Sequence, residues 1–404
     1  VGFDPAGKPN PYTIVDAGMR ENLDVKVVAP VPDFLAASNT TMWASAYELL
    51  INEIKRHVTT LIFCNSRYKA ERTSLRMKEI AQKDLNLGVH HGSMAKDSRL
   101  EAENDLKQGN LDALIATSSL ELGIDVGSVD LVYQLESSKS VAAGLQRIGR
   151  AGHLLDATSK GRVLVFERDE LLEAAVICKA MLKGNIDAIR IPRNCLDVLA
   201  QQIVGAVAAE DWYDEDLFGL IRRTYPYTGL KREQFDAVLR MLAGEFSFEM
   251  SHAPRALVIW DRATGRLSPT RSSAHASVMN VGTISEASEY EVVIENTNRR
   301  IGRGSAEFVD DSLRLGDVFV FGSSTWKVTG KRKNRVYVEE TPGATPTVPW
   351  WTGPIQPRTT EVGREVGRLR SFIASRIDDP HLRKDLKKQY CLGPDAAAAV
   401  IDYV

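Results

Sequence analysis

The chain has 404 residues, a formal net charge of -2, 44% hydrophobic residues and 26% charged residues. This length exceeds that of one ordinary domain, and this balance excludes collagen-like, mucin-like and wholly disordered proteins. A nearly neutral chain has no global basic field, so any nucleic-acid binding must come from local clusters of charge.

The cysteines and the hydropathy of the sequence indicate in which cellular compartment the protein is expected. The four cysteines, Cys64, Cys178, Cys195 and Cys391, lie far apart and form no C-x-x-C pair. This spacing argues against a zinc site and a disulfide framework, so we expect no bound metal and a reducing cytoplasm. No apolar run approaches the roughly twenty residues that span a bilayer, so we expect no membrane partner. The start at Val1 is not a signal peptide and lacks an initiator Met, so we expect the chain to be cut from a longer protein.

The first 170 residues alternate between β-rich runs and helical patterns. Strands that are separated by helices predict right-handed crossovers and a mostly parallel sheet with helices on both faces. The expected strands are residues 25–28, 59–64, 88–92, 111–116, 129–133 and 161–166. In such α/β sheets ligands bind beyond the carboxyl ends of the strands, so functional residues are expected in the loops that follow them.

The rest of the chain changes character twice. Helical patterns between residues 171 and 248 predict a small helical or winged-helix domain. From residue 256 onward β-rich runs predict a small antiparallel barrel or curled sheet, and two charged helices are expected after Pro357. We therefore expect an α/β domain over 1–170, a helical or winged-helix domain over 171–250, and a β-rich domain with C-terminal helices over 251–404.

A phosphate-binding loop is suggested by Gly2–Lys8, which matches G-x-x-x-x-G-K, but Pro9 occupies the Ser/Thr position. No strand precedes this segment, and its prolines oppose the required turn into a helix. No other G-K-[ST] occurs, and no Asp-Glu-x-His/Asp follows a strand. We therefore expect that this chain alone does not hydrolyse a nucleotide.

Two segments of the α/β region carry a more specific pattern. Residues 116–125 (ATSSLELGID) follow an expected strand, and residues 146–153 (QRIGRAGH) come about twenty residues later. A capped strand end and a surface helix with two arginines are each common, so each segment alone has an ordinary structural explanation. Together they are specific, because Arg147 and Arg150 share one helical face and can both reach a phosphate. Such a pair suits an arginine finger that stabilises phosphoryl transfer from a neighbouring domain.

In these segments the chain resembles the second RecA-like domain of superfamily 2 helicases. Residues 60–67 resemble motif IV, residues 90–93 the motif that follows it, residues 117–125 motif V, and residues 146–153 motif VI. The run TSSLELGIDVGSVDLVYQLESSKSVAAGLQRIGRAGH, with MNVGTI and PTVPWWTG further on, is similar to the Lhr (large helicase-related) family over most of the chain. The resemblance implies a RecA-like fold for the first 170 residues.

The resemblance also implies roles for individual residues. Arg150 is expected to be the arginine finger, with Arg147 and Gln146 as further catalytic residues. The residues expected to face ATP and Mg²⁺, both held mainly by a first RecA-like domain, are Gly123, Asp125, Gln146, Arg147 and Arg150. The residues expected to follow the phosphates of a single strand are Asn65, Ser66, Arg67, His91, Gly92, Ser93, Thr117 and Ser118. For His91 a structural role at a strand end is the alternative.

The sequence departs from the family pattern in two places. The first RecA-like domain, with its Walker A lysine and DExH box, is absent, so we expect a fragment or one half of a split motor. Near Trp351, Pro354 stands where the family signature has an acidic residue, which affects the expected shape of that loop.

The segment around Trp350 and Trp351 also has a physical interpretation. Tryptophans bounded by prolines suit a platform on which bases stack, although both rings have the alternative of covering the edge of the β-rich domain. The resemblance favours Trp351 as a stacking residue and Ile284 as a wedge near the same strand. Basic runs at residues 299–303 and 327–335 predict a path for a single strand. Arg383–Lys384 and Lys387–Lys388 are interpreted as solvated surface.

The resemblance implies the C-terminal motor half of an ATP-dependent 3′-to-5′ helicase, and the polarity and the substrates follow from the resemblance alone. The expected partners are single-stranded DNA or RNA, DNA or RNA:DNA duplexes with a 3′ single-stranded tail, and a first RecA-like domain of the same protein. Two alternatives stay open, a single-strand-binding module without motor activity and an RNA helicase of the same superfamily.

Overall fold

The structure is a computed structural model that describes residues 2–4, 7–15, 22–82, 84–121, 129–151, 158–245, 255–279, 289–350 and 357–404. It has two compact units. The α/β unit consists of Met19–Ala188 with Ala287–Val404, and the helical unit consists of Val1–Gly18 with Ile189–Glu286. In the part of the chain that the structure describes, no helix is long and apolar enough to cross a membrane.

A six-stranded parallel sheet forms the centre of the α/β unit and confirms the predicted α/β class. Its order is β1-β6-β5-β2-β4-β3. The strands are β1 (Asn22–Val28), β2 (Thr60–Phe63), β3 (Leu87–His90), β4 (Ala113–Ala116), β5 (Leu131–Leu135) and β6 (Thr158–Leu164). All residues of β2, β4 and β5 are buried, as expected for parallel strands that are covered on both faces.

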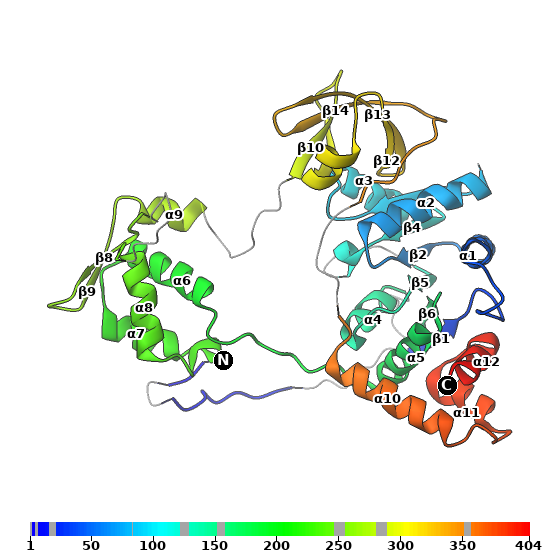
Figure 1. Cartoon of the computed structure of the whole chain (residues 1–404), viewed down its shortest axis with the longest axis horizontal. Helices are drawn as coiled ribbons and strands as arrows, with labels where there is room; N and C mark the ends of the chain where they lie inside the picture. The colour runs from blue at the N-terminus through cyan, green and yellow to red at the C-terminus, as the bar shows by residue number, and fades with distance from the viewer. Residues whose placement is uncertain are drawn as a thin grey trace. The chain divides into compact units, whose positions relative to one another are not determined.

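Helices cover both faces of this sheet (Figure 1). On one face α1 (Asn39–Ile54) and α2 (Arg67–Ala81) share a core with Ile62 and Ile115. On the other face the core around Phe63 contains residues of the C-terminal segment and of three further helices. These are α3 (Lys96–Lys107), α4 (Val141–Ile148) and α5 (Arg168–Lys183). Helix α5 falls in the range expected for the second domain, but it packs against α4 and β1 because its apolar side is nearly continuous from Leu171 to Met181.

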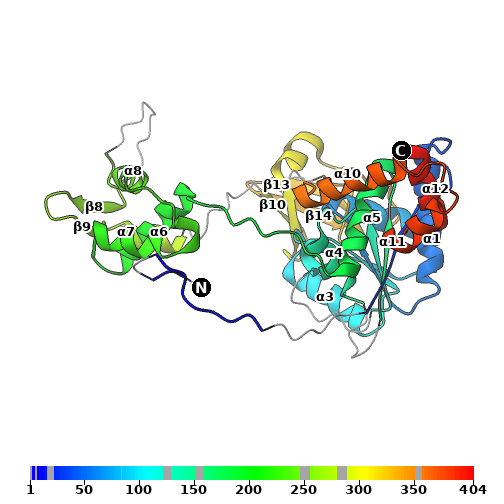
Figure 2. The same cartoon turned by 90° about the horizontal axis from the view of Figure 1, so that it is seen from below.

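The C-terminal segment folds as three helices rather than the expected two. They are α10 (Thr360–Ala374), α11 (Leu382–Tyr390) and α12 (Pro394–Tyr403). Cys391 adopts a left-handed φ of 59° and ends α11, and Pro394 begins α12, a position where its missing N–H is not needed. All three helices contact α5, and Figure 2 shows them gathered beside it.

A five-stranded curled sheet, the accessory sheet, completes the α/β unit. Its order is β11-β10-β14-β13-β12, with antiparallel pairs except for the parallel pair β10–β14. The strands are β10 (Glu289–Ile294), β11 (Arg300–Ser305), β12 (Val318–Phe321), β13 (Ser324–Arg332) and β14 (Arg335–Glu340). A short helical turn, Phe308–Ser312, follows β11. The accessory sheet shares its core with α1 and α2, and Figure 1 shows β12 next to α2.

The helical unit combines helices with a small antiparallel sheet of order β7-β9-β8. Its elements are α6 (Leu196–Ala209), β7 (Trp212–Tyr213), α7 (Asp214–Arg222), α8 (Arg232–Leu242), β8 (Val258–Asp261), β9 (Arg266–Pro269) and α9 (Ser273–Met279). Phe235, Val258 and Leu267 lie in one core, which explains why β8 belongs to this unit. The sequence had placed the β-rich run at 256–260 in the third domain, and the structure differs because the apolar side of this hairpin packs on the helices.

Candidate functional site

Arg147 of α4 is buried at the centre of a polar cluster that reaches the surface at Asn65. Its side chain is 2% exposed, and Nε donates to Oε1 of Glu121 at 2.5 Å. Nη1 donates to Oδ1 of Asn65 at 2.9 Å and to Oε1 of Gln134 at 2.7 Å. The guanidinium also lies 5.6 Å from the ring centre of Phe63. We call Arg147, Glu121, Asn65 and Gln134 the arginine cluster. Its donors are engaged inside the protein, so Arg147 connects the segments that contain these residues.

Asn65 connects the cluster to a further loop. Its Oδ1 accepts a second hydrogen bond from Nε2 of Gln134 at 3.3 Å, and its Nδ2 donates to the carbonyl of Ser137 at 2.8 Å. Ser137 lies between Glu136 and Lys139, which both have a left-handed φ of 66°. Non-glycine residues adopt this conformation at a cost, so the loop after β5 is held by its surroundings.

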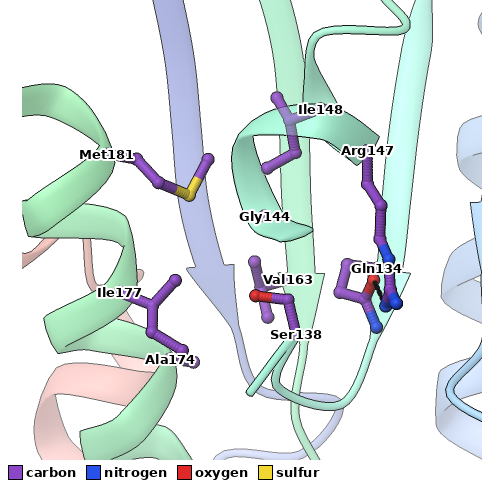
Figure 3. Close-up of a pocket in the computed structure, with 9 residues that line it drawn as sticks. All are labelled: Gln134, Ser138, Gly144, Arg147, Ile148, Val163, Ala174, Ile177 and Met181. Carbon is purple, nitrogen blue, oxygen red and sulfur yellow. Dashed lines mark hydrogen bonds between the residues drawn. The ribbon is translucent and has the colours of Figure 1, made fainter. Parts of the chain in front are cut away.

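A small pocket lies behind α4. It is lined mainly by apolar side chains of α4, α5 and β6, with Arg147 and Gln134 along one side (Figure 3). Gly144 brings α4 close to α5, since a Cβ there would lie 2.9 Å from Sδ of Met181. A side chain at this position would press against α5 at Met181 and Ile177.

The other residues expected to face ATP differ in their exposure. Gln146 is exposed, and Arg150 is partly exposed, with Nη2 donating to the carbonyl of Glu121 at 2.6 Å. Arg150 therefore lies closer to the surface than Arg147. Gly123 and Asp125 lie outside the described residues.

The residues expected to follow a single strand lie at one edge of the sheet, because β2, β3 and β4 are parallel and end there. Asn65, Ser66, Gly92 and Ser118 are exposed, and the side chain of Arg67 is 38% exposed. Ser66 caps α2 by accepting a hydrogen bond from the N–H of Lys69 at 3.2 Å. These exposed residues remain candidates for contacting a strand.

Three residues with the same expected role are buried. His91 has no exposed surface, Ser93 is 3% exposed and Thr117 is 8% exposed. The hydroxyl of Ser93 accepts a hydrogen bond from Nη1 of Arg67 at 2.6 Å. We therefore leave the side chains of His91, Ser93 and Thr117 out of the proposed contact surface.

His91 is buried because the accessory sheet covers it. Its Nε2 lies 2.9 Å from Oε1 of Glu71, which has no exposed surface and also accepts the N–H of Gly322 at 2.7 Å. The ring of Phe321 packs edge-on against His91 at 5.6 Å. The alternative of a structural role for His91 is consistent with these contacts.

Backbone contacts extend this docking to the residues after His91. Ser93 accepts the N–H of Arg303 at 2.8 Å, and Ala95 donates to the carbonyl of Ile301 at 2.9 Å. Between them, Gly302 forms a bridge with Met94, and a Cβ on Gly302 would lie only 2.4 Å from the Ser93 carbonyl oxygen. The loop after β3 is thus fixed by a strand that lies about two hundred residues further along the chain.

The basic runs of the accessory sheet are partly neutralised by acids. Arg300 and Arg335 pair with Glu291 at 3.2 and 3.0 Å, and Arg303 pairs with Glu289 at 3.2 Å. The ammonium group of Lys331 donates to two backbone carbonyls, those of Val309 and Leu313. The strand path expected at 299–303 and 327–335 therefore has less free positive charge than the sequence suggests.

Of the two tryptophans, Trp350 is half-buried and packs edge-on against Phe308 at 6.4 Å. Its carbonyl accepts the hydroxyl of Ser305 at 3.0 Å, so this residue closes the edge of the accessory sheet. Trp351 and Ile284 lie outside the described residues. Among the described residues, no group of three or more His, Cys, Asp or Glu side chains is placed to hold a metal ion.

Sequence reasoning missed Glu71, Glu121, Gln134 and Gly302. Gln134 had a usable signal, since it is a polar residue inside an otherwise apolar strand. Glu71 follows Arg67 by one helical turn on a side of α2 that turns out to be buried. For Gly302 the sequence holds no signal, because its partner is distant in the chain.

Comparison with known proteins agrees with this arrangement. The family described as "Large helicase-related protein, winged helix domain" matches residues 179–348, and "Helicase conserved C-terminal domain" matches residues 44–155. The chain is 37% identical to the ATP-dependent helicase Lhr-Core of Saccharolobus solfataricus, over 98% of this chain and 46% of that protein. The chain carries a helicase C-terminal domain followed by the winged-helix domain of the Lhr family.

Two further relatives extend the comparison. Lhr-Core of Methanocaldococcus jannaschii is 35% identical over 97% of this chain and 45% of that protein. The structure of the Mycobacterium smegmatis helicase Lhr bound to ssDNA and AMP-PNP matches with a TM-score of 0.70 and 31% identity, over 95% of this chain and 45% of that one. The chain thus spans about half the length of the Lhr relatives that it matches. The two family models and the match to the M. smegmatis Lhr structure confirm the predicted resemblance to the Lhr family. They also confirm the RecA-like and winged-helix folds.

Proposed function

We propose that this chain provides the second RecA-like domain and the accessory domains of an ATP-dependent helicase that moves 3′ to 5′ on single-stranded nucleic acid. The observation that carries the proposal is the arginine cluster. Through it, Arg147 of motif VI is bonded directly to Asn65 of motif IV and to Glu121 within motif V. A translocating motor needs such a connection, since its strand-holding segments must respond to its nucleotide-facing segments.

The proposed nucleotide site is shared between domains. ATP and Mg²⁺ would be held mainly by a first RecA-like domain of the same protein, and bound ATP would supply the free energy for movement. On this chain Gln146 of α4 and Arg150, two residues beyond its end, fit a triphosphate, since both reach the surface near the buried Arg147. Arg150 would stabilise the charge that develops during phosphoryl transfer, as an arginine finger does. Arg147 would hold the position of α4.

The proposed strand site is the exposed part of the sheet edge. Asn65, Ser66, Arg67, Gly92 and Ser118 offer short polar groups, a guanidinium and open backbone, which contact phosphates without reading bases. The proposed substrates are DNA or RNA:DNA duplexes with a 3′ single-stranded tail. The direction of movement and these substrates rest on the family alone.

The proposal is tested by two measurements on matched proteins. Fluorescence anisotropy with labelled single-stranded DNA and RNA measures strand binding by this chain, and strand-stimulated ATP turnover is measured for this chain and for a longer protein that includes a first RecA-like domain. We expect the chain to bind strands without turnover, and Arg150→Ala in the longer protein to abolish turnover while strand affinity is retained.

Arg56→Ala is the control, since Arg56 is 72% exposed and pairs with Glu53 at the opposite edge of the sheet. Normal turnover in Arg150→Ala would refute the arginine finger. Strand binding with no strand-stimulated turnover in the longer protein would favour a binding module without motor activity. Stimulation by RNA and not by DNA would favour an RNA helicase.

A further inference from the structure

Helix α11 presents a cluster of cations on its exposed side. Arg383, Lys384, Lys387 and Lys388 are all exposed. Arg383 lies four residues before Lys387, and Lys384 lies four residues before Lys388, so like charges are neighbours on the helix surface. This spacing destabilises a helix. We call these four residues the α11 cations.

Helix stability does not account for the α11 cations. Lys387 and Lys388 lie in the last turn, where positive charge complements the helix dipole, but Arg383 and Lys384 lie in the first turn, where it opposes the dipole. The acid within the helix, Asp385, pairs with Arg376 at 2.8 Å instead.

The surroundings also leave this charge without acidic partners. Among the described residues, no carboxylate lies within ion-pair distance of the α11 cations, and Arg383 donates to the carbonyl of Pro394 at 3.0 Å. Some exposed cations of the same unit are paired, as Arg300 and Arg335 are with Glu291. The chain as a whole carries a net charge of -2, so this concentration is local.

The four cations surround a shallow hollow. Its lining consists of Pro380, Arg383, Lys384, Lys387, Lys388 and Pro394. The two prolines give it rigid ends, and α11 is anchored beneath it by the buried side chains of Leu382, Leu386 and Tyr390. A pre-formed site with several cations and no acid suits a polyanion with repeated charges.

We propose that the α11 hollow binds backbone phosphates of the nucleic acid, as a contact separate from motifs IV and V. The inference rests on the proposed function, which makes nucleic acid the polyanion this protein meets. It changes the interpretation of the α11 cations from solvated surface to a second anchor for the substrate. Phosphate contacts of this kind add affinity without sequence preference and weaken as salt concentration rises.

The test compares Lys387→Gln/Lys388→Gln with the wild-type chain in anisotropy titrations over a range of salt concentrations. Each lost phosphate contact lowers the slope of log affinity against log salt by about 0.7 for a single strand and about 0.9 for a duplex. The double variant is therefore expected to lower the slope by about 1.4 or about 1.8, and the value and the substrate affected show which part of a tailed duplex lies at α11.

The matched control is Lys55→Gln/Arg56→Gln. Lys55 and Arg56 are also adjacent exposed cations at a helix end, but they pair with Asp84 at 3.2 Å and Glu53 at 2.9 Å. We expect this control to keep the wild-type slope. Arg383→Gln/Lys384→Gln is a second variant, and circular dichroism shows that each variant retains its helices.

Every outcome bears on the proposal. A reduced slope in both α11 variants and not in the control supports it. Wild-type slopes in both α11 variants, with strand binding intact, would overturn it and leave the proposed function standing. If the wild-type chain bound neither single strands nor duplexes, the proposed function would fail first and this inference with it.

Discussion

Arg147 donates a hydrogen bond of 2.9 Å to Asn65, a residue 82 positions earlier in the chain. One partner belongs to the segment expected to face ATP and the other to the segment expected to hold a strand. A movement of α4 therefore cannot leave the end of β2 unaffected. This bond gives the proposed motor a direct connection, and it makes the cluster a suitable target for mutation.

Replacing Arg147 by Ala should destabilise the α/β unit strongly. The change leaves Glu121, Asn65 and Gln134 without their shared donor, and removing one partner of a buried ionic group costs about 3–5 kcal/mol. Arg147→Lys should recover only part of this, because an ammonium lacks the planar fork of donors. Arg150→Ala, at a more exposed position, should cost about 1 kcal/mol or less. Urea unfolding measures all three, and equal stability of Arg147→Ala and the wild type would contradict a structural role for the cluster.

Gly302→Ala should disturb the docking of the accessory sheet. The new methyl group would lie 2.4 Å from the Ser93 carbonyl oxygen and 2.5 Å from the Phe321 ring, so a loss of about 1–3 kcal/mol is expected from overpacking. Gly367→Ala in α10 is the control, since nothing lies within 4 Å of its new methyl group and Ala favours a helix by about 1 kcal/mol. In thermal unfolding, Gly302→Ala should lower the melting temperature and Gly367→Ala should raise it. An unchanged melting temperature in Gly302→Ala would mean that β11 is free to move away from the loop after β3.

The stability of the α/β unit should fall in mild acid because of His90. Its ring is 1% exposed, between Ser119 Oγ at 2.8 Å and Glu103 Oε1 at 2.9 Å, and burial lowers the pKa of His90 below its usual value. The unfolded chain then binds the proton more tightly. Neutral His90 therefore contributes fully to the free energy of unfolding above the pKa of the unfolded state, about 6.5. This contribution is lost as the pH falls through that value toward the lower pKa of the folded state.

The test is the slope of unfolding free energy against pH. His90→Gln should reduce the slope between about pH 7 and about pH 5 by up to 1.4 kcal/mol per pH unit. His381→Gln, at an exposed histidine, is the control. An unchanged slope in His90→Gln would show that other groups determine the acid sensitivity.

Thiol reactivity should separate Cys195 from the other cysteines. Burial raises the pKa of Cys64 to about 12 and that of Cys391 to about 11, and it raises the pKa of Cys178 well above its usual value. Cys195 is only half-buried. In a native thiol assay near neutral pH, the fast phase should correspond to Cys195 and disappear in Cys195→Ser. Fast labelling of Cys64 would show that the strand end beside Asn65 opens readily.

The two neighbouring tryptophans should respond differently to mutation. Trp350→Ala should lower stability, since Trp350 packs against Phe308 at the edge of the accessory sheet. Trp351→Ala should weaken single-strand binding by about 1–3 kcal/mol if a base stacks on this ring, with little loss of stability. In a longer protein it should reduce unwinding more than ATP turnover. Unchanged strand affinity in Trp351→Ala would indicate that both rings are structural.

Local pattern was enough to predict the central sheet. Each of the six strands of the parallel sheet was expected from an apolar run such as Leu61–Phe63. The loops of motifs IV and V follow β2 and β4, and motif VI begins in the last turn of α4. These features depend on neighbours in sequence, which periodicity and strand propensity capture.

The rest of the site depends on contacts between distant residues. The burial of His91 is produced by Phe321 and Gly322, and the burial of Arg147 by Asn65 and Glu121, none of which follows from the spacing of the motifs. The basic residues also gave a misleading prediction of the strand path, because their acidic partners lie elsewhere in the sequence. The run at 299–303 is basic in sequence, but Glu289 and Glu291 from the neighbouring strand pair with its arginines.

The packing of α10, α11 and α12 against α5 has a consequence for biosynthesis. Helix α5 ends at Lys183, but its covering helices begin at Thr360, so about 180 further residues must be synthesised first. At about 5–20 residues per second this takes roughly 10–35 s, during which the apolar side of α5 is open to water or to chaperones. The residues of the helical unit up to Glu286 are made within that interval. This unit has its own core, so it is able to fold before the helices that cover α5 are synthesised. Ribosome-bound chains that stop between these points should therefore be the aggregation-prone ones.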